Sequence, residues 1–537
     1  MRATTVTMLA AVSVVALVAA CGGSTHHPSH AQRSPTRALP QRAHVVFASD
    51  TGAALGNVSS AHVAGKVISS LGFDPSRDGF SFQNYGFIAG NELDAHAMRE
   101  LFGDVVCATA PSDTCTLTPA AAQWAQQTAE AMVGGHCFGF SMTALRFFKH
   151  NLSPSTYGAS IPYSLGLSPE LQSEIAYGWA TQVVPAVQQA ELVGQPSAVV
   201  KFLARAMRNP SGEVYSLGLY NGPPSDPQRE GHAVTPTGIA SLGNGKYAIL
   251  LYDNNKPGTT QAMLVDAKAE TWQYLVATNP SQPNAVWSGQ GTANELALAP
   301  LSSILHQQQC PFCSAAGRTG VTTISLGGNP VAHAHLLITT SDGRRLGYVG
   351  HRFVNQIKGA RVIRPALNQI WKATPEPVYV VPANDQVKIT LSGGNPTGSD
   401  AAQVHVSGPG FGATVARLMP RAGAQAEITL TPGGAKLSLR LSGAPGSAPT
   451  LQLARDQGRK GNLVTVAPTR LKAGTKLSVG LRPTSHRVSV TSSQASSPVA
   501  VTLRSVGPQG IKTVQKQNVA VHAGQPTTLS LGLIRVG

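Results

Sequence analysis

The sequence predicts an α+β part followed by an all-β, sandwich-like C-terminal part. Apolar residues recur at helical spacing across residues 118–148, whereas from about residue 318 they alternate with polar ones. The charge divides at the same place. Residues 1–315 carry 16 Lys and Arg against 19 Asp and Glu, a net −3, and residues 316–537 carry 25 against 6, a net +19. A charged content of only 12% argues against a coiled coil or charge-driven disorder, so two or more folded modules are expected.

The N-terminus has the features of an export signal. Arg2 supplies a positive start, an apolar stretch covers residues 8–18, and small residues directly precede Cys21. This arrangement resembles the bacterial lipoprotein box, which implies that 1–20 is a signal peptide and that Cys21 carries the lipid. Residues 21–43 are rich in Gly, Ser, His and Pro, which is typical of a flexible tether. We therefore expect an exported protein that is lipid-anchored to the extracytoplasmic face of the bacterial cell membrane.

The remaining five cysteines form an odd set outside the cytoplasm. Cys107 and Cys115 enclose a short polar loop and are expected to form a disulfide. Cys310 and Cys313 have Cys-x-x-Cys spacing, which fits a redox-active pair, a structural pair, or one half of a cross-link to the first two. Cys137 is left over. An unpaired thiol in an exported protein is a candidate reactive group.

Cys137 is expected at the start of a helix. Thr118 and Pro119 open a helix over 120–133, with the hydroxyl at the N-cap and the proline at the first position. Gly134-Gly135 ends it, and a second helix then begins at Cys137. The free N–H groups and the positive dipole end of a helix N-terminus favour a thiolate, which is the nucleophilic form of cysteine.

A candidate base and its partner lie on a predicted hairpin. His232 begins one strand, Gly243-Asn244-Gly245 is a turn signal, and residues 246–252 form the returning strand. Asp253 and Asn254 follow directly. Because antiparallel strands bring such ends together, a carboxylate or amide there is expected to orient the His232 imidazole.

Three segments in this order resemble the papain-like cysteine peptidases: Gly-Gly-x-Cys-x-Gly-aromatic-Ser at 134–141, Gly-His-Ala-Val at 231–234 and Tyr-Asp-Asn-Asn at 252–255. The resemblance covers about residues 75–280 and implies a papain-like domain over 44–317. It also implies that Cys137 is the nucleophile, His232 the base, and Asp253, or alternatively Asn254, the orienting group. The implied substrate is a peptide or protein, and no cofactor is implied.

The oxyanion hole departs from the family pattern. The family usually has a glutamine six positions before the cysteine, and here that position is Ala131. Asn84, or Gln83 beside it, is expected to supply the amide from farther upstream. His136, next to Cys137, is expected to shape the site and not to act as the base.

Several other chemistries lack their sequence patterns. There is no phosphate-binding loop, no dinucleotide G-x-G-x-x-G, no H-E-x-x-H, no G-x-S-x-G and no paired Cys-x-x-Cys set for zinc. No metal is therefore expected. The function expected is that of a membrane-anchored thiol hydrolase acting on a peptide or amide bond. A transglutaminase-like acyl transferase and a non-catalytic cell-surface adhesion lipoprotein are the alternatives.

Two further regions complete the prediction. Residues 169–208 are expected to form two core helices, punctuated by Pro185 and Pro196. Residues 318–537 are expected to form a basic β-sandwich region of one domain or two, with apolar residues inward and Lys or Arg outward. Its expected partner is an anionic envelope polymer or phospholipid. Nucleic acid is not expected, because the region has few aromatic residues for base stacking.

Overall fold

The computed structural model describes most of the chain after residue 64. The described ranges are 65–86, 92–209, 211–221, 230–276, 285–289, 296–313, 320–328, 335–350, 352–366, 376–393, 401–443, 445–482, 487–494 and 498–530. The predicted signal peptide, Cys21 and the tether lie outside these residues.

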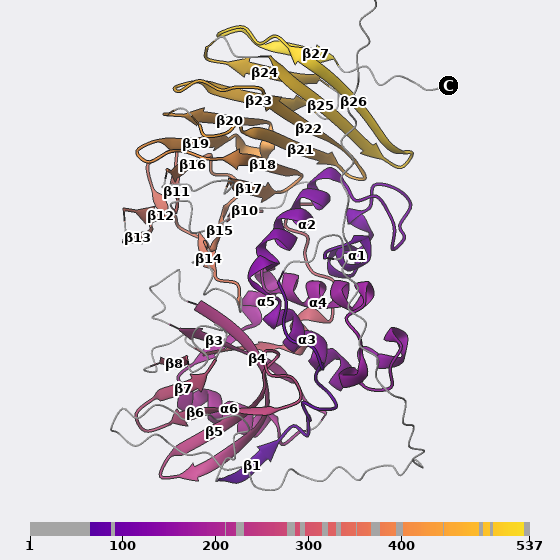
Figure 1. The fold of residues 1–537 in the computed structure, drawn as a ribbon, viewed down its shortest axis with the longest axis vertical. Coiled ribbons are helices and arrows are strands. Elements are labelled where there is room, and N and C mark those ends of the chain that lie inside the picture. Colours follow the sequence, from indigo (N-terminus) through magenta and orange to yellow (C-terminus); the bar gives the residue numbers. More distant parts are fainter. Residues whose placement is uncertain are drawn as a thin grey trace, which may run out of the picture. The chain divides into compact units, whose positions relative to one another are not determined.

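Among the described residues, six α-helices lie in the N-terminal part, drawn from indigo to magenta in Figure 1. They are α1 (Ala95–Phe102), α2 (Pro119–Ala131), α3 (Cys137–Phe148), α4 (Pro169–Thr181), α5 (Pro185–Ala190) and α6 (Pro196–Ala206). Helix α2 begins as predicted, since the Thr118 hydroxyl accepts a hydrogen bond from the Ala121 N–H. The region 169–208 holds three helices where two were predicted, because Pro185 and Pro196 each occupy the first turn of a new helix. None of the described helices is long and apolar enough to cross a bilayer.

An antiparallel sheet of nine strands accompanies these helices. The strands are β1 (Lys66–Ser70), β2 (Leu192–Gly194), β3 (Tyr215–Asn221), β4 (Glu230–Gly243), β5 (Lys246–Tyr252), β6 (Thr260–Asp266), β7 (Thr271–Leu275), β8 (Val286–Gly289) and β9 (Leu296–Pro300). Their order is β2-β9-β3-β4-β5-β6-β7-β8, and β1 pairs with β4. Helix α3 packs on β3 and β4, and α4 packs on α3. The sheet therefore supports the helix that begins at Cys137.

The described residues of the C-terminal part form two antiparallel sheets of nine strands each. One has the order β14-β15-β10-β17-β18-β21-β22-β25-β26, and the other, here called the third sheet, has the order β13-β12-β11-β16-β19-β20-β23-β24-β27. Their strands are β10 (Val321–Gly327), β11 (Leu336–Thr340), β12 (Arg345–Val349), β13 (Arg352–Asn355), β14 (Arg361–Ile363), β15 (Val378–Pro382), β16 (Val387–Ser392), β17 (Ala402–Gly408), β18 (Phe411–Leu418), β19 (Gln425–Leu430), β20 (Lys436–Leu441), β21 (Thr450–Gln457), β22 (Lys460–Pro468), β23 (Lys476–Arg482), β24 (Arg487–Ser492), β25 (Val499–Gly507), β26 (Gly510–Val519) and β27 (Thr527–Ser530).

Alternating hairpins build these two sheets. The chain places β17–β18 in one sheet, β19–β20 in the other, β21–β22 back in the first and β23–β24 in the second. Side chains from both sheets share one hydrophobic core, including Ile389, Leu439 and Val479 from the third sheet and Val404 and Leu453 from its partner. The two sheets therefore form a sandwich. The predicted fold class, α+β followed by an all-β sandwich-like region, is confirmed (Figure 1).

The disulfides follow the nearest-neighbour pairing. Cys107 is bonded to Cys115, as predicted, and Cys310 is bonded to Cys313. A cross-link between the two pairs, one of the three alternatives for Cys310 and Cys313, is therefore wrong. Cys137 is the free cysteine among the described residues, and it is buried.

Candidate active site

Cys137 is the first residue of α3, as predicted from the glycine pair before it. Its side chain is fully buried, and its Sγ accepts a hydrogen bond from the backbone N–H of Ala233 at 3.3 Å. Ala233 follows His232 on β4, so this contact joins the start of the helix to the strand that carries the imidazole. The first N–H groups of a helix have no partner within it, so the backbone around Cys137 presents donors to a group bound there.

His232 is held by Asp253. Its Nε2 lies 2.9 Å from Asp253 Oδ1, and both side chains are fully buried. Asp253 follows β5, and the pairing of Thr235 with Tyr252 brings the ends of the two strands together. Because Nε2 is engaged, Nδ1 is the nitrogen left to exchange a proton, and it has no hydrogen-bond partner among the described residues.

His232 and Asp253 each stabilise the charged form of the other. Burial alone would lower the pKa of His232, but the negative charge and hydrogen bond of Asp253, together with the interaction with the Cys137 thiol, raise it to about 10. Burial would raise the pKa of Asp253, and the charge and hydrogen bond of His232, the charge of Lys256 and the hydroxyl of Tyr274 lower it to about 2. An imidazolium and a carboxylate are therefore the favoured forms at neutral pH.

Three further residues surround Asp253, and the sequence did not indicate these contacts: Tyr274, Asn255 and Lys256. The Tyr274 hydroxyl donates to Oδ2, and the Asn255 N–H donates to Oδ1 at 2.9 Å. Lys256 reaches back to the carbonyl of Leu275 on β7 and lies over the Tyr274 ring. With both oxygens engaged, the carboxylate has one orientation toward His232. The alternation of aromatic residues in β7 was the only sequence signal for Tyr274.

Asn254, the alternative orienting group, contacts other atoms. Its Nδ2 donates to the carbonyl of Cys137 at 3.2 Å and to the carbonyl of Ala233 at 3.0 Å. The side chain therefore ties the start of α3 to β4, while Asp253 is the residue that contacts His232.

The two candidates for the oxyanion hole, Gln83 and Asn84, differ in their surroundings. Gln83 is exposed, and its amide donates to the carbonyl of Asn255.

Asn84 lies directly beside the start of α3. It is buried, and its Oδ1 accepts a hydrogen bond from the His136 N–H at 2.7 Å. Its Nδ2 has no hydrogen-bond partner among the described residues. A buried amide donor without a partner is costly unless something binds it, so Asn84 is better placed than Gln83 to contact a bound oxygen.

His136 is fixed by neighbours that the sequence did not single out. Its Nε2 lies 2.9 Å from Glu92 Oε2, and its Nδ1 lies 2.8 Å from the carbonyl of Tyr85. The rings of His136 and Tyr85 are 4.5 Å apart between centroids. Both ring nitrogens of His136 are occupied, whereas His232 Nδ1 has no hydrogen-bond partner among the described residues.

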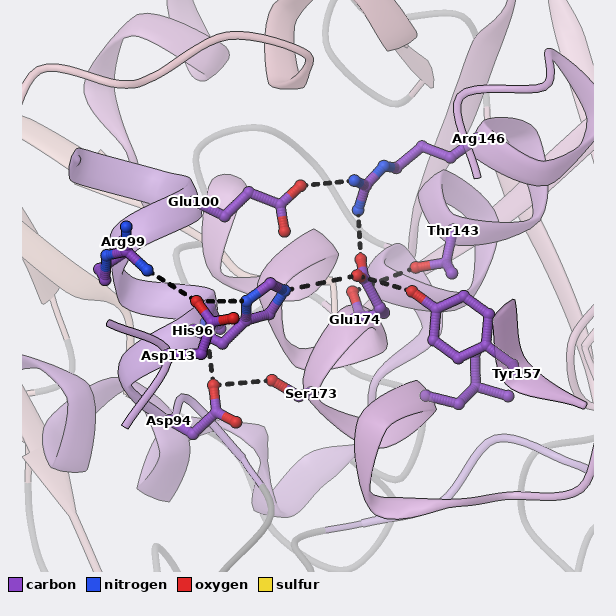
Figure 2. Close-up of polar contacts among 12 residues, drawn as sticks. Asp94, His96, Arg99, Glu100, Asp113, Thr143, Arg146, Tyr157, Ser173 and Glu174 are labelled. Carbon is purple, nitrogen blue, oxygen red and sulfur yellow. Dashed lines mark hydrogen bonds and ion pairs between the residues drawn. The ribbon is translucent and has the colours of Figure 1, made fainter. Parts of the chain in front are cut away.

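A second cluster of titratable side chains joins α1, α3 and α4 (Figure 2). The ligand atoms of His96, Glu100 and Glu174 lie within 4.8 Å of one another, as in a metal site. However, the Arg146 guanidinium donates to both carboxylates at 2.5 Å, and the Tyr157 hydroxyl donates to Glu174. Arg146 thus supplies the positive charge that a metal would bring, and the cluster is best described as an ion-pair network that holds α3 in place.

Comparisons with known proteins add no further information about the site. No family model matches the chain, and no curated protein or solved structure shows significant similarity to it.

Proposed function

We propose that this protein is a thiol-dependent acyl-transfer enzyme, with hydrolysis of a peptide or amide bond as its main reaction. The observation that supports this most directly is the buried grouping of three side chains: Cys137 Sγ accepts a hydrogen bond from the N–H of Ala233, the residue after His232, and His232 Nε2 lies 2.9 Å from Asp253 Oδ1. One imidazole nitrogen is bound to a carboxylate, and the other is free for a proton from the thiol. This is the arrangement that the resemblance to papain-like peptidases implies.

The reaction follows from these contacts. The Cys137 thiol gives its proton to His232 Nδ1, which produces a thiolate beside the imidazolium that Asp253 stabilises, and the thiolate Sγ then attacks the carbonyl carbon of the substrate. The amide Nδ2 of Asn84 and the Cys137 N–H stabilise the resulting oxyanion. The carbon–nitrogen bond then breaks, His232 returns the proton to the leaving amine, and a thioester remains on Cys137. Water, activated by His232, hydrolyses the thioester and restores the thiol. An amine in place of water would give acyl transfer.

A non-catalytic role is the second candidate, and one observation favours it. Cys137, His232 and Asp253 are all fully buried, so a substrate reaches Sγ only if neighbouring residues move. A protein that only binds a partner would not need these residues to move. The same burial would protect a structural thiol.

Acylation by a small activated ester separates the two candidates. In the wild-type chain, a p-nitrophenyl ester is expected to acylate Cys137, with the adduct located by mass spectrometry of the digested protein. His232→Ala is expected to lower the acylation rate by about 10²–10⁴, the usual contribution of a general base. Cys137→Ala should abolish the adduct. Adding a primary amine then distinguishes hydrolysis from transfer.

The control is alkylation of Cys137 in denaturant, which should proceed at the same rate in wild type and His232→Ala. If the folded wild type acylates no faster than folded His232→Ala, the enzyme proposal is refuted and the non-catalytic candidate is supported.

The role of Asn84 predicts a selective defect. Asn84→Asp keeps the acceptor for the His136 N–H and removes the free donor, so it should slow acylation by about 10²–10³. Iodoacetamide alkylation forms no oxyanion, and its rate should change much less. Gln83→Ala is the matched control and should leave both rates near those of the wild type. An equal loss of both reactions in Asn84→Asp would show that the residue acts through folding alone.

A further inference from the structure

The outward face of the third sheet carries a concentrated positive charge. In β16, β19, β20, β23 and β24, alternate residues such as Ile389, Leu439 and Val479 fill the sandwich core, so the residues between them lie on the opposite face of the sheet. Six of these outward residues are exposed cations, which we call the cationic face: Lys388, Lys436, Arg440, Lys476, Arg482 and Arg487. Glu427 on β19 is the one acidic residue among the outward positions of these five strands.

Two pairs within this face place like charges directly opposite each other. Arg440 on β20 pairs with Lys476 on β23, and Arg482 on β23 pairs with Arg487 on β24. Directly opposed like charges destabilise a sheet. Glu427 lies 3.8 Å from Arg440 and 3.7 Å from Lys388, so it offsets the repulsion only at the Arg440–Lys476 pair. An anion bound from outside would remove the remaining repulsion.

A row of hydroxyl groups crosses the strands between the two pairs. Thr429, Ser438, Ser478 and Thr491 lie side by side on four successive strands, and the Ser478 hydroxyl donates to Ser438 at 2.9 Å. The two serines in the middle are buried, and the two threonines at the ends are half-buried. The row is on the order of 15 Å long, given the spacing of neighbouring strands. Arg440 and Lys476 lie two residues to one side of it. Lys436 lies two residues to the other side, and the Arg482–Arg487 pair lies two residues beyond Lys436.

The composition of this face favours a polymer over a bilayer or a nucleic acid. These five strands expose no large apolar side chain that would enter a lipid headgroup layer. They also contain no aromatic residue on which a base would stack. What they offer is cations at regular spacing, which pair with carboxylate or phosphate groups, and the half-buried hydroxyls of Thr429 and Thr491, which exchange hydrogen bonds with sugar hydroxyls.

We propose that the cationic face binds a linear acidic polysaccharide, which lies along the hydroxyl row with its anionic groups against the cations on both sides. This surface is independent of Cys137, so the proposal does not rest on the proposed enzymatic function. The negative charge of the ligand would offset the two like-charge pairs. Binding should therefore weaken steeply as salt screens these contacts.

The test is binding of the full-length chain to polygalacturonate, measured by isothermal titration calorimetry. At about 50 mM NaCl binding is expected, and at about 500 mM NaCl it should be at least about tenfold weaker. The double variant Arg440→Glu/Lys476→Glu should weaken binding by at least about tenfold at low salt, a change of about 1.4 kcal/mol. The matched control is Arg504→Glu/Lys512→Glu, which makes the same change of charge at exposed positions of the other sheet and should bind like the wild type.

Four outcomes would overturn the proposal. One is no binding at low salt, and another is equal weakening in both double variants, which would show that only net charge matters. The third is equal binding of neutral dextran. The fourth is tighter binding to vesicles of anionic phospholipid or to single-stranded DNA than to polygalacturonate, which would assign the face to a different class of partner. Thermal unfolding of both variants, expected within a few degrees of the wild type, verifies that binding is measured on folded protein.

Discussion

Asp253→Ala is expected to lower the free energy of unfolding by about 3–5 kcal/mol near pH 6, the usual cost of removing one partner from a buried ion pair. Asp253 is fully buried, and its oxygens accept hydrogen bonds from His232, Asn255 and Tyr274. Without it, the His232 imidazole and the Tyr274 hydroxyl remain buried with unpaired donors. Urea unfolding followed by tryptophan fluorescence measures the loss, since four of the five tryptophans (Trp124, Trp179, Trp272 and Trp287) lie in the α+β part.

The difference between wild type and Asp253→Ala should depend on pH in a defined direction. Folding raises the pKa of His232 from 6.5 to about 10, so the stabilisation from its proton is complete below pH 6.5 and is lost as the pH rises toward 10. Folding lowers the pKa of Asp253 from 3.8 to about 2, so its contribution is complete above pH 3.8 and is lost as the pH falls toward 2. The difference should be largest between these limits and shrink on both sides.

Asp266→Ala is the matched control. Asp266 also ends a strand, but it is only partly buried and accepts hydrogen bonds from the backbone N–H groups of Lys268 and Ala269 in the following turn. Its loss should cost no more than about 1 kcal/mol. If Asp253→Ala is no more destabilising than Asp266→Ala, or if the difference stays constant from pH 6 to pH 10, the buried ion pair does not stabilise the fold.

The elements around the candidate site could be predicted because local signals specify them. Thr118, Pro119 and the glycine pair at 134–135 determine where α2 and α3 begin, and Gly243 to Gly245 form the turn that pairs β4 with β5. Once that hairpin is paired, His232 must lie near Asp253. The alternation of apolar residues after residue 318 likewise determines which side chains enter the sandwich core.

The contacts that complete the site could not be predicted, because they join segments far apart in the sequence. Asn254 and Asp253 are neighbours with similar hydrogen-bonding groups, and only the packing of α3 against β4 decides that Asn254 contacts Cys137 and Ala233. Asn84 and Gln83 are likewise adjacent amides, and their segment has no periodicity that would show which one faces Cys137. Tyr274 reaches Asp253 across 21 residues and two strands. Such choices depend on tertiary geometry and have no local signature.

Gly139→Ala is expected to destabilise the protein and disturb the candidate site together. A Cβ at Gly139 would lie 2.0 Å from the carbonyl oxygen of Ile175 and 2.9 Å from the backbone nitrogen of Trp179. Both atoms belong to the backbone of α4, which cannot give way as a flexible side chain would. Helix α3 must therefore move, and Cys137, two residues earlier on the same helix, moves with it away from the Ala233 N–H.

The direction of the stability change in Gly139→Ala distinguishes overpacking from ordinary helix propensity. Alanine is normally favoured over glycine in a helix by about 1 kcal/mol, so an unobstructed Gly→Ala change in α3 would stabilise the protein. Overpacking instead predicts a loss of about 1–3 kcal/mol or more in urea unfolding, together with slower acylation of Cys137. Gly166→Ala, where a Cβ would have no neighbour within 4 Å, should leave both quantities near those of the wild type. A stabilised Gly139→Ala variant would show that α3 and α4 are not in backbone contact, and the position assigned to Cys137 against His232 would lose its structural basis.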